Sequence, residues 1–214
     1  MNLSRYILLT AILMVFICYG CGKKSCGGKR GITYEFDLPV TISPAKDTFR
    51  IGDTIWIENA FSDQMYNAED GKTYTVHNFD FKASWQVCDM NYPPYTYPDP
   101  IIIPLSGTTN IYSAAPNVQS YQIKHDYSNG SYKYKAGIVA TRSGAYLVSF
   151  STFLKATKVD ITECPNEDVK NLTFNTNNGG NNHYEALQYS KDISAAKATK
   201  AEFDKYGGYC FYIK

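Results

Sequence analysis

The chain has 214 residues, of which 44% are hydrophobic, so it is long and apolar enough to fold around a core of its own. Its 21 basic and 20 acidic side chains leave a net charge of +1. The sequence shows no basic face, and a nearly neutral chain gains little by releasing counterions, which excludes nucleic acid as the partner.

The N-terminus is organised as an export signal. Arg5 precedes an uncharged apolar stretch over residues 6–18, and Gly20 stands immediately before Cys21. A basic start, a hydrophobic stretch too short to span a bilayer comfortably and a small residue before the cleavage point are typical of a secretory signal peptide. We therefore interpret residues 1–20 as a signal peptide. Its removal takes away Arg5 and no acidic residue, which leaves the mature chain near neutrality.

The end of this signal, Cys18-Tyr19-Gly20-Cys21, resembles the lipobox of bacterial lipoproteins. In that family the final cysteine is diacylglycerylated, becomes the new N-terminus and is N-acylated. The resemblance implies lipidation of Cys21 and anchoring to a bacterial membrane of the cell envelope, with the outer membrane favoured. Acyl chains on one cysteine anchor a protein firmly, since each buried CH₂ contributes about 0.8 kcal/mol. An ordinary secretory cut after Gly20 is the alternative.

Residues 21–31 carry glycines and charges and offer no apolar side chain to bury, which predicts a flexible tether. Cys26 lies within this tether. It is a poor rival for lipidation because Lys24 and Ser25 precede it.

Short alternating runs broken by turn residues follow, which predict β-strands. The first strand is expected over residues 34–42, where Pro39 favours an edge position. The second is expected over residues 48–57, turning through Gly52-Asp53. Further strands are predicted over residues 74–81, 83–87, 121–123, 132–136 and 144–150. This spacing is typical of an all-β sandwich, which we assign to residues 32–155.

Two phrases resemble strands of bacterial immunoglobulin-like domains. They are Phe49-Arg50-Ile51-Gly52-Asp53-Thr54-Ile55 and Ser143-Gly144-Ala145-Tyr146-Leu147-Val148. The resemblance implies a mainly β fold, an Ig-like antiparallel β-sandwich. The overall layout is similar to the uncharacterised small lipoproteins of Gram-negative envelopes, which implies a location and an architecture but no assigned chemistry.

The last part of the chain, residues 156–214, differs in composition. Residues 175–182 form an Asn/Gly-rich loop, and residues 183–205 are rich in Ala, Lys and Glu, which predicts one or two short helices. Gly207-Gly208 ends the helical part, and residues 209–213 predict a final strand. A terminal strand needs a sheet to join, so we expect an extension packed on the sandwich, with a small helical appendage outside it.

The sequence contains no catalytic motif, so we expect neither an enzyme nor a cofactor. The three histidines are too few and too scattered for a metal site. His77 is expected to be an ordinary partner of its sheet neighbours, and His125 is expected to be solvated. The acids Asp63, Glu69 and Asp70 lack the spacing of a cation-binding loop.

One stretch is a candidate binding surface. Residues 90–100 hold Tyr92, Tyr95 and Tyr97 among four prolines, and proline stiffens the chain, so the rings lose little entropy on binding. A sugar or a protein partner would stack on them. The alternative is a crossover whose rings pack against the sandwich. Trp56 and Trp85 are expected in the core.

The cysteines suggest one disulfide. Once Cys21 is lipidated, Cys26, Cys88, Cys164 and Cys210 remain, and they allow three complete pairings. A bond between Cys164 and Cys210 would close the polar loop and the helices onto the sandwich, contributing about 3 to 4 kcal/mol. Two buried free thiols are the alternative.

Three classes of function remain. The sequence favours a lipid-anchored, non-enzymatic cell-envelope lipoprotein that acts as a structural or interaction module, with the membrane and an envelope protein as partners. A glycan-binding accessory lipoprotein that uses the Tyr/Pro-rich loop is the alternative, since the 15% aromatic content suits glycan surfaces as well as a sandwich core. An envelope hydrolase needs polar groups that converge in a pocket, for which the sequence gives no evidence.

Overall fold

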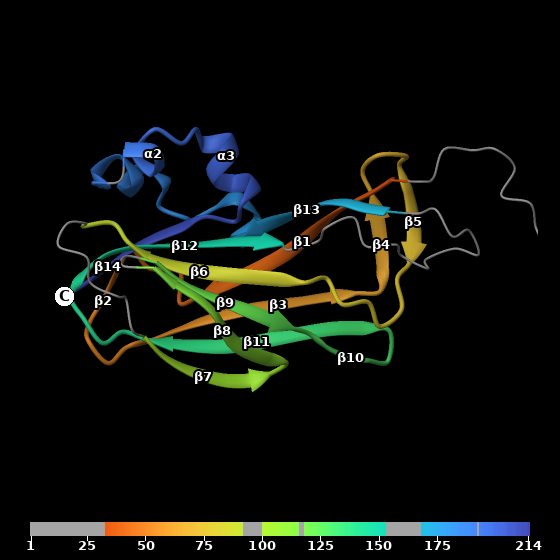
Figure 1. Ribbon diagram of the computed structural model, residues 1–214, viewed down its shortest axis with the longest axis horizontal. Coiled ribbons are helices and arrows are strands. Elements are labelled where there is room, and N and C mark those ends of the chain that lie inside the picture. The colour runs from red at the N-terminus through yellow and green to blue at the C-terminus, as the bar shows by residue number, and fades with distance from the viewer. Residues whose placement is uncertain (1–32, 92–99, 116–117, 153–167, 192) are drawn as a thin grey trace, which may run out of the picture.

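The computed structural model describes residues 33–91, 100–115, 118–152, 168–191 and 193–214. Within them, two six-stranded sheets pack face to face, and a two-stranded ribbon adjoins them (Figure 1). The first sheet contains β10 (Asp126–Ser128), β11 (Ser131–Val139), β3 (Thr54–Ser62), β1 (Thr33–Ser43) and β13 (Asp168–Thr176) in that order, with β7 (Ile101–Ser106) also paired to β11. The second contains β2 (Thr48–Phe49), β14 (Tyr209–Ile213), β12 (Gly144–Thr152), β6 (Ala83–Asp89), β9 (Val118–Lys124) and β8 (Thr108–Ala115). The ribbon pairs β4 (Gln64–Asn67) with β5 (Lys72–Thr75).

The mainly β sandwich with a small helical part and a final strand is confirmed. The sheets are mixed and not wholly antiparallel, because β1 runs parallel to β13 and β14 runs parallel to β2. Both pairs join strands far apart in the chain, as parallel neighbours must. The predicted extension, residues 156–214, supplies one strand to each sheet.

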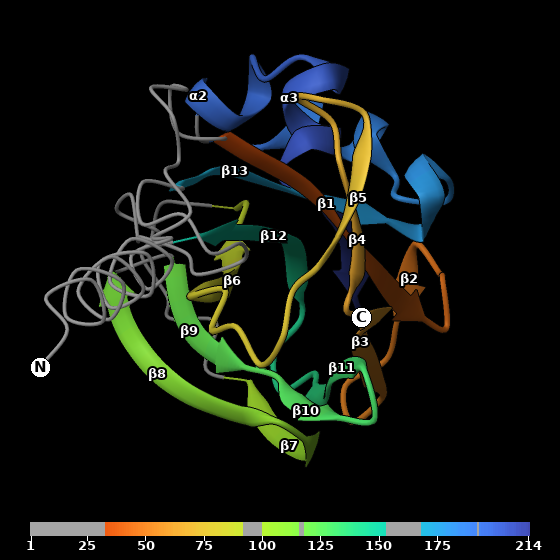
Figure 2. The same ribbon diagram turned by 90° about the vertical axis from the view of Figure 1, so that its right-hand side faces the viewer.

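Figure 2 shows the two sheets end-on. The core lies between them and is rich in aromatic side chains. Alternation along the strands directs one side chain in two inward. Trp85 stacks on Tyr121 with 4.2 Å between ring centroids, and its indole N–H donates to the Tyr134 hydroxyl at 2.9 Å. Many of the tyrosines are therefore core residues whose hydroxyls find partners.

Several predicted strand positions need correction. The strand predicted over residues 74–81 ends at Thr75, because Asn78 and Lys82 adopt left-handed backbone angles that no strand accommodates. Pro39 does not lie on an edge strand, since β1 has β13 on one side and β3 on the other. The proline is tolerated because β1 pairs with β3 only from Thr41 onward, so at Pro39 the strand is paired with β13 alone.

Trp56 was expected in the core, and that prediction is wrong. In β3 the buried positions are its neighbours Ile55 and Ile57, so the indole points to the outer face of the first sheet. There it covers Gly137, where an added Cβ would lie 2.8 Å from the indole. Trp85, in contrast, is fully buried as predicted.

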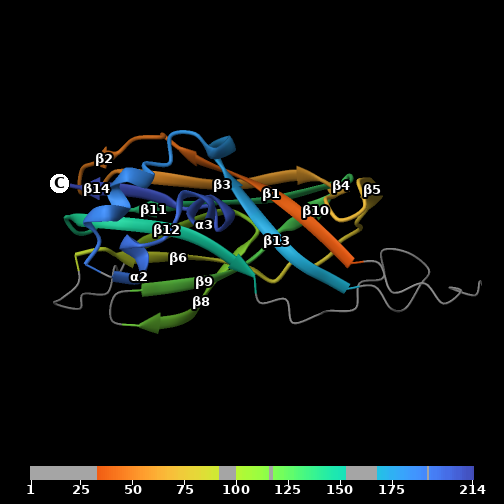
Figure 3. The same ribbon diagram turned by 90° about the horizontal axis from the view of Figure 1, so that it is seen from above.

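The helical appendage consists of η2 (Tyr184–Tyr189), α2 (Ile193–Ala196) and α3 (Lys200–Lys205), which follow the short turn η1 (Asn177–Gly179). It lies over β12 and β14, as Figure 3 shows from above. The Lys191 amide donates to the Met90 carbonyl at 2.9 Å, which ties the appendage to the second sheet. No helix in the described residues is long and apolar enough to cross a membrane.

Candidate functional site

A cavity of about 600 Å³ lies between the appendage and the outer face of the second sheet. We call it the appendage groove. Its volume falls within the range of ligand pockets, about 300 to 1,000 Å³. It is lined by Gln86, Leu147, Ser149, Phe150, Ser151, Leu187, Ala195, Lys197, Ala198, Glu202, Phe203, Tyr206 and Gly208.

The floor of the groove is polar but uncharged. Gln86 donates from its side-chain amide to the Ser149 hydroxyl at 2.9 Å, and the hydroxyls of Ser84 and Ser151 lie 2.7 Å apart. These pairs are cross-strand neighbours of β6 and β12, so their backbones hold them in register. We call Gln86, Ser149 and Ser151, which line the groove, together with their buried neighbour Ser84 the neutral floor.

The same face continues beyond the groove onto β9 and β8. Ser120 pairs with Gln86, and Gln122 lies between Ser84 and Asn110. Directly paired residues point to the same face of a sheet, so uncharged polar side chains form two cross-strand rows, one over three strands and one over four.

The roof is apolar and is fixed by the end of the appendage. Phe203 is buried, and the Tyr184 ring meets it edge to face at 5.2 Å. Thr199 and Glu202 form a capping box that starts α3. The chain then turns sharply through Gly207 and Gly208.

Both glycines are required by close packing. Gly207 has a φ of +57°, and an added Cβ would lie 2.8 Å from the Thr176 hydroxyl oxygen. A Cβ on Gly208 would lie 2.5 Å from the Phe203 ring. The two glycines therefore let β14 leave α3 directly beneath the roof.

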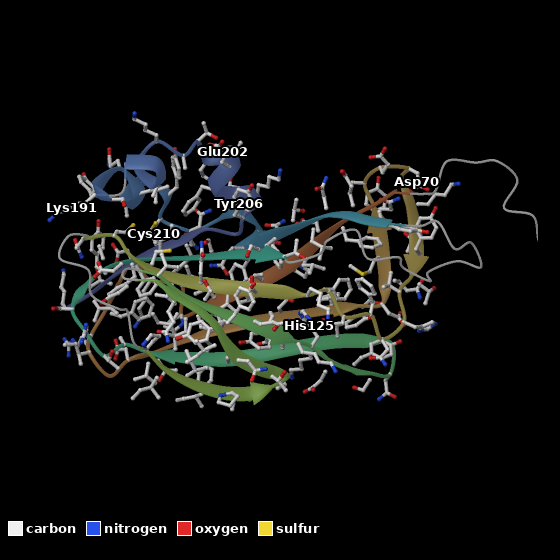
Figure 4. The ribbon with its side chains drawn as sticks, viewed as in Figure 1. Asp70, His125, Lys191, Glu202, Tyr206 and Cys210 are labelled. Atoms are coloured by element: carbon white, nitrogen blue, oxygen red, sulfur yellow. The ribbon has the colours of Figure 1, made fainter. Side chains whose placement is uncertain are left out.

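Tyr206 stands beside the groove on a fixed backbone. Its carbonyl accepts from the Phe150 amide at 2.7 Å, and it forms an isolated bridge with Phe174. Its side chain remains about half exposed, at 51%. Figure 4 shows Tyr206 below α3, near Glu202. A half-exposed ring on a rigid backbone is suited to contact a ligand at low entropic cost.

The groove contains one carboxylate and one ammonium among its described lining residues, Glu202 and Lys197. Hydrogen bonds from the Thr199 backbone and hydroxyl lower the pKa of Glu202, so the carboxylate is ionised and occupied by its cap. This arrangement favours binding over proton transfer.

Two cysteines lie on this outer face of the second sheet. Leu147 of β12 is paired with Cys88 on one side and Cys210 on the other. Burial raises the pKa of the Cys210 thiol to about 12, so it is a neutral and unreactive thiol. Cys210 is a free cysteine in the structure, and Cys164 lies outside the described residues, so the pairing of the two stays a prediction.

A separate cluster forms at the far end of the sandwich. The Tyr127 hydroxyl donates to Asp63 at 2.7 Å, and His77 Nδ1 lies 2.8 Å from the same hydroxyl and 3.2 Å from Asp63. The hydrogen bond from Tyr127 lowers the pKa of Asp63. The sequence predicted that His77 lies in a strand, but it lies in a loop after β5. The cluster ties this loop to the hairpin of β10 and β11.

His125 is buried, so the expectation that it is solvated is wrong. It bonds to Asn59 and packs among aromatic rings, and burial lowers its pKa to about 4. His125 stands two residues after the buried Ile123 and therefore continues the inward-facing alternation of β9. The sequence analysis did not use this alternation because a turn lies beside His125. Among the described residues no group of three metal-ligating side chains occurs.

A second, polar hollow of about 460 Å³ lies on the other side of α3. Its carboxylates are already engaged, because Asp37 accepts from Thr173 at 2.9 Å and Asp204 accepts from Asn182 and Lys200. The Asn-rich loop thus serves mainly to hold β13 against the appendage.

The predicted site residues Cys21, Tyr92, Tyr95, Tyr97 and Cys164 lie outside the described residues. The sequence analysis missed the appendage groove altogether. Ser84, Gln86, Ser149 and Ser151 occupy alternate positions of two strands, as solvent-facing polar residues ordinarily do, so no local signal indicated the groove.

Comparisons with known proteins give no family. No family model matches the chain, and no curated protein matches it. Among solved structures, the human F-spondin reeler domain shares 10% identity over 59% of this chain and 85% of that chain, with a TM-score of 0.33. A type II cohesin domain from the cellulosome of Acetivibrio cellulolyticus shares 10% identity over 64% of this chain and 91% of that chain, with a TM-score of 0.30. Values this low support no inference about activity or partner.

Proposed function

We propose that the protein is a lipid-anchored, non-enzymatic lipoprotein of the cell envelope that acts as an interaction module, and that it binds through the appendage groove. The export signal and Cys21 provide the anchor. The observation that carries the binding role is the groove itself, in which a rigid, hydrogen-bonded polar floor faces an apolar roof.

Two features support binding over catalysis. The polar groups of the floor are amides and hydroxyls, which do not titrate near neutral pH and so do not serve as general acids or bases. Glu202 is the one carboxylate among the described lining residues, and its Oε2 accepts from the Thr199 amide and hydroxyl.

The anchor is tested by fractionation. Cys21→Ala should release the protein from the membrane fraction, whereas Cys26→Ala should leave it there. Equal membrane association of the wild type and Cys21→Ala would refute the anchor.

The binding role is tested by placing a photo-crosslinking amino acid at Lys197, which is exposed beside the groove, in cells that express the lipidated full-length protein. The matched control carries it at Lys133, which is exposed on the outer face of the first sheet. We expect a discrete envelope adduct from position 197 and none from position 133. Equal adducts at both positions, or none at either, would contradict the proposal.

A glycan-binding accessory lipoprotein is the second candidate. The neutral floor supports it independently of the Tyr/Pro-rich loop, because amides and hydroxyls pair well with sugar hydroxyls. Replacing Tyr92, Tyr95 and Tyr97 together by Ala distinguishes the two surfaces. If the loop is the recognition surface, this variant loses binding while its thermal midpoint stays within a few degrees of the wild type.

A further inference from the structure

We infer that the appendage groove binds a neutral saccharide chain, which lies across the second sheet from the roof toward β8. This inference rests on the proposed function, since it names the ligand class of the same site. The described lining residues of this site belong to β6, β12, the appendage and the turn after α3.

The first support is the chemistry of the floor. Sugar hydroxyls donate and accept at once, and so do the amide of Gln86 and the hydroxyls of Ser149 and Ser151. The Gln86 amide uses one N–H on Ser149, so its second N–H and its carbonyl oxygen retain hydrogen-bonding capacity. The floor is therefore positioned before a ligand arrives, which reduces the entropy lost on binding.

The second support is charge. No charged residue stands in the two cross-strand rows, which are Ser149-Gln86-Ser120 and Ser151-Ser84-Gln122-Asn110. At the groove, Lys197 and Glu202 carry opposite charges. The described part of this surface offers single lysines, Lys197 at the groove and Lys124 at the end of β9, and not the arginine or lysine pairs that a carboxylated or sulfated ligand would need.

The third support is the apolar wall. One face of a pyranose ring presents C–H groups, and these pack against aromatic and aliphatic side chains while the ring's hydroxyls point to its edges. Phe203 and Leu187 provide such a wall, and Tyr206 presents a half-exposed ring beside it. A wholly apolar ligand would offer no partner to the remaining hydrogen-bonding capacity of Gln86, which costs free energy when water is excluded.

The fourth support is the open end of the site. The polar rows leave the roof and continue over β9 to Asn110 of β8. In Figure 1 these strands lie successively farther from the helices. A single sugar would use only the groove, whereas a chain would use the whole row.

The test measures binding of neutral hexasaccharides of glucose, mannose, xylose and galactose by the mature, lipidated protein in detergent micelles, with an oligogalacturonate as the charged comparison. We expect at least one neutral hexasaccharide to bind more tightly than the oligogalacturonate. We also expect the matching monosaccharide to bind more weakly than the chain.

Variants locate the site. Tyr206→Ala should weaken binding about tenfold, and Ser149→Ala about 3- to 10-fold. The control is Tyr189→Ala, which removes another exposed tyrosine, one that is not among the described lining residues of the groove, and it should leave affinity unchanged. Unchanged thermal midpoints show that the variants are folded.

The outcomes separate this inference from the proposed function. Absence of saccharide binding together with a discrete protein adduct from position 197 would overturn the inference and leave the interaction module standing. Absence of both would overturn both. Saccharide binding that Tyr206→Ala and Ser149→Ala leave unchanged, or that oligogalacturonate matches, would also overturn the inference.

Discussion

Apolar side chains are buried in two regions that differ in size and in construction. The core between the sheets is continuous and largely aromatic, with Trp85, Tyr121 and Tyr134 near its centre. The cluster beneath the appendage is small and borders a cavity, and its largest buried ring is Phe203. The sandwich therefore provides the stability of the fold, while the appendage shapes a surface that adds little to it. Elements with few buried contacts open most readily, so we expect the appendage to open more readily than the sandwich.

The largest effect should come from the core. Trp85→Ala removes a fully buried indole and leaves the Tyr134 hydroxyl without its donor, so the free energy of unfolding should fall by about 3 to 5 kcal/mol. Denaturant unfolding measures it. Trp56→Ala is the matched control and should cost distinctly less, because that indole lies on the outer face. Equal losses in both variants would contradict the assignment of the two faces.

The core should also weaken in mild acid through His125. Its pKa of about 4 in the folded protein lies below the ordinary value of 6.5, so the unfolded chain binds a proton first as the pH falls. Stability should therefore be complete above about pH 6.5 and decline toward pH 4, by at most about 3 kcal/mol. Asp80 and Asp126 act in the opposite direction and limit the effect.

The variant His125→Gln isolates this contribution. Its thermal midpoint should depend less on pH between 4 and 6.5 than that of the wild type. A wild-type midpoint that is flat over this interval would show that His125 is not buried as a neutral ring.

Within the appendage, Phe203→Ala should cost about 2 to 3 kcal/mol, because the ring is buried but borders a cavity. Hydrogen exchange should accelerate in α3 while β3 and β11 stay protected. Equal acceleration in the sandwich strands would show that the appendage is part of the main core.

The difference between the core and the appendage explains which elements could be predicted from the sequence. Alternation within β3, β11 and β12 is strong, because one face of each strand is buried, and it identified those strands from the sequence. Two features had no local signal. The strand β13 was missed because only Val169, Leu172 and Phe174 interrupt its polar residues, and β14 becomes parallel to β2 only through tertiary packing.

The groove was beyond sequence reasoning for a similar reason. Ser149 and Ser151 look like ordinary solvent-facing positions, and nothing local shows that a helix separated by about 50 residues covers them. The role of Gly207 and Gly208 as chain breakers was predictable. Their close approach to Thr176 and Phe203 was not, because it depends on where β13 and α3 meet.

The smallest effect should come from the helix cap. Thr199→Ala removes the side-chain partner of the Glu202 amide and should cost about 1 kcal/mol. It should also raise the pKa of Glu202 toward its ordinary value, because the hydroxyl donor is lost. Carboxyl carbon chemical shifts followed against pH measure this change, and Thr173→Ala, outside the groove, is the control.

The most direct test of the account is hydrogen exchange of the mature, lipidated full-length protein with and without the neutral hexasaccharide that binds best. The account predicts added protection in peptides that contain β6, the Ser149–Ser151 part of β12, and α3 through Tyr206. Peptides from β3 and from residues 92–99 should not change. Protection confined to residues 92–99, or to the first sheet, would contradict a binding site in the appendage groove.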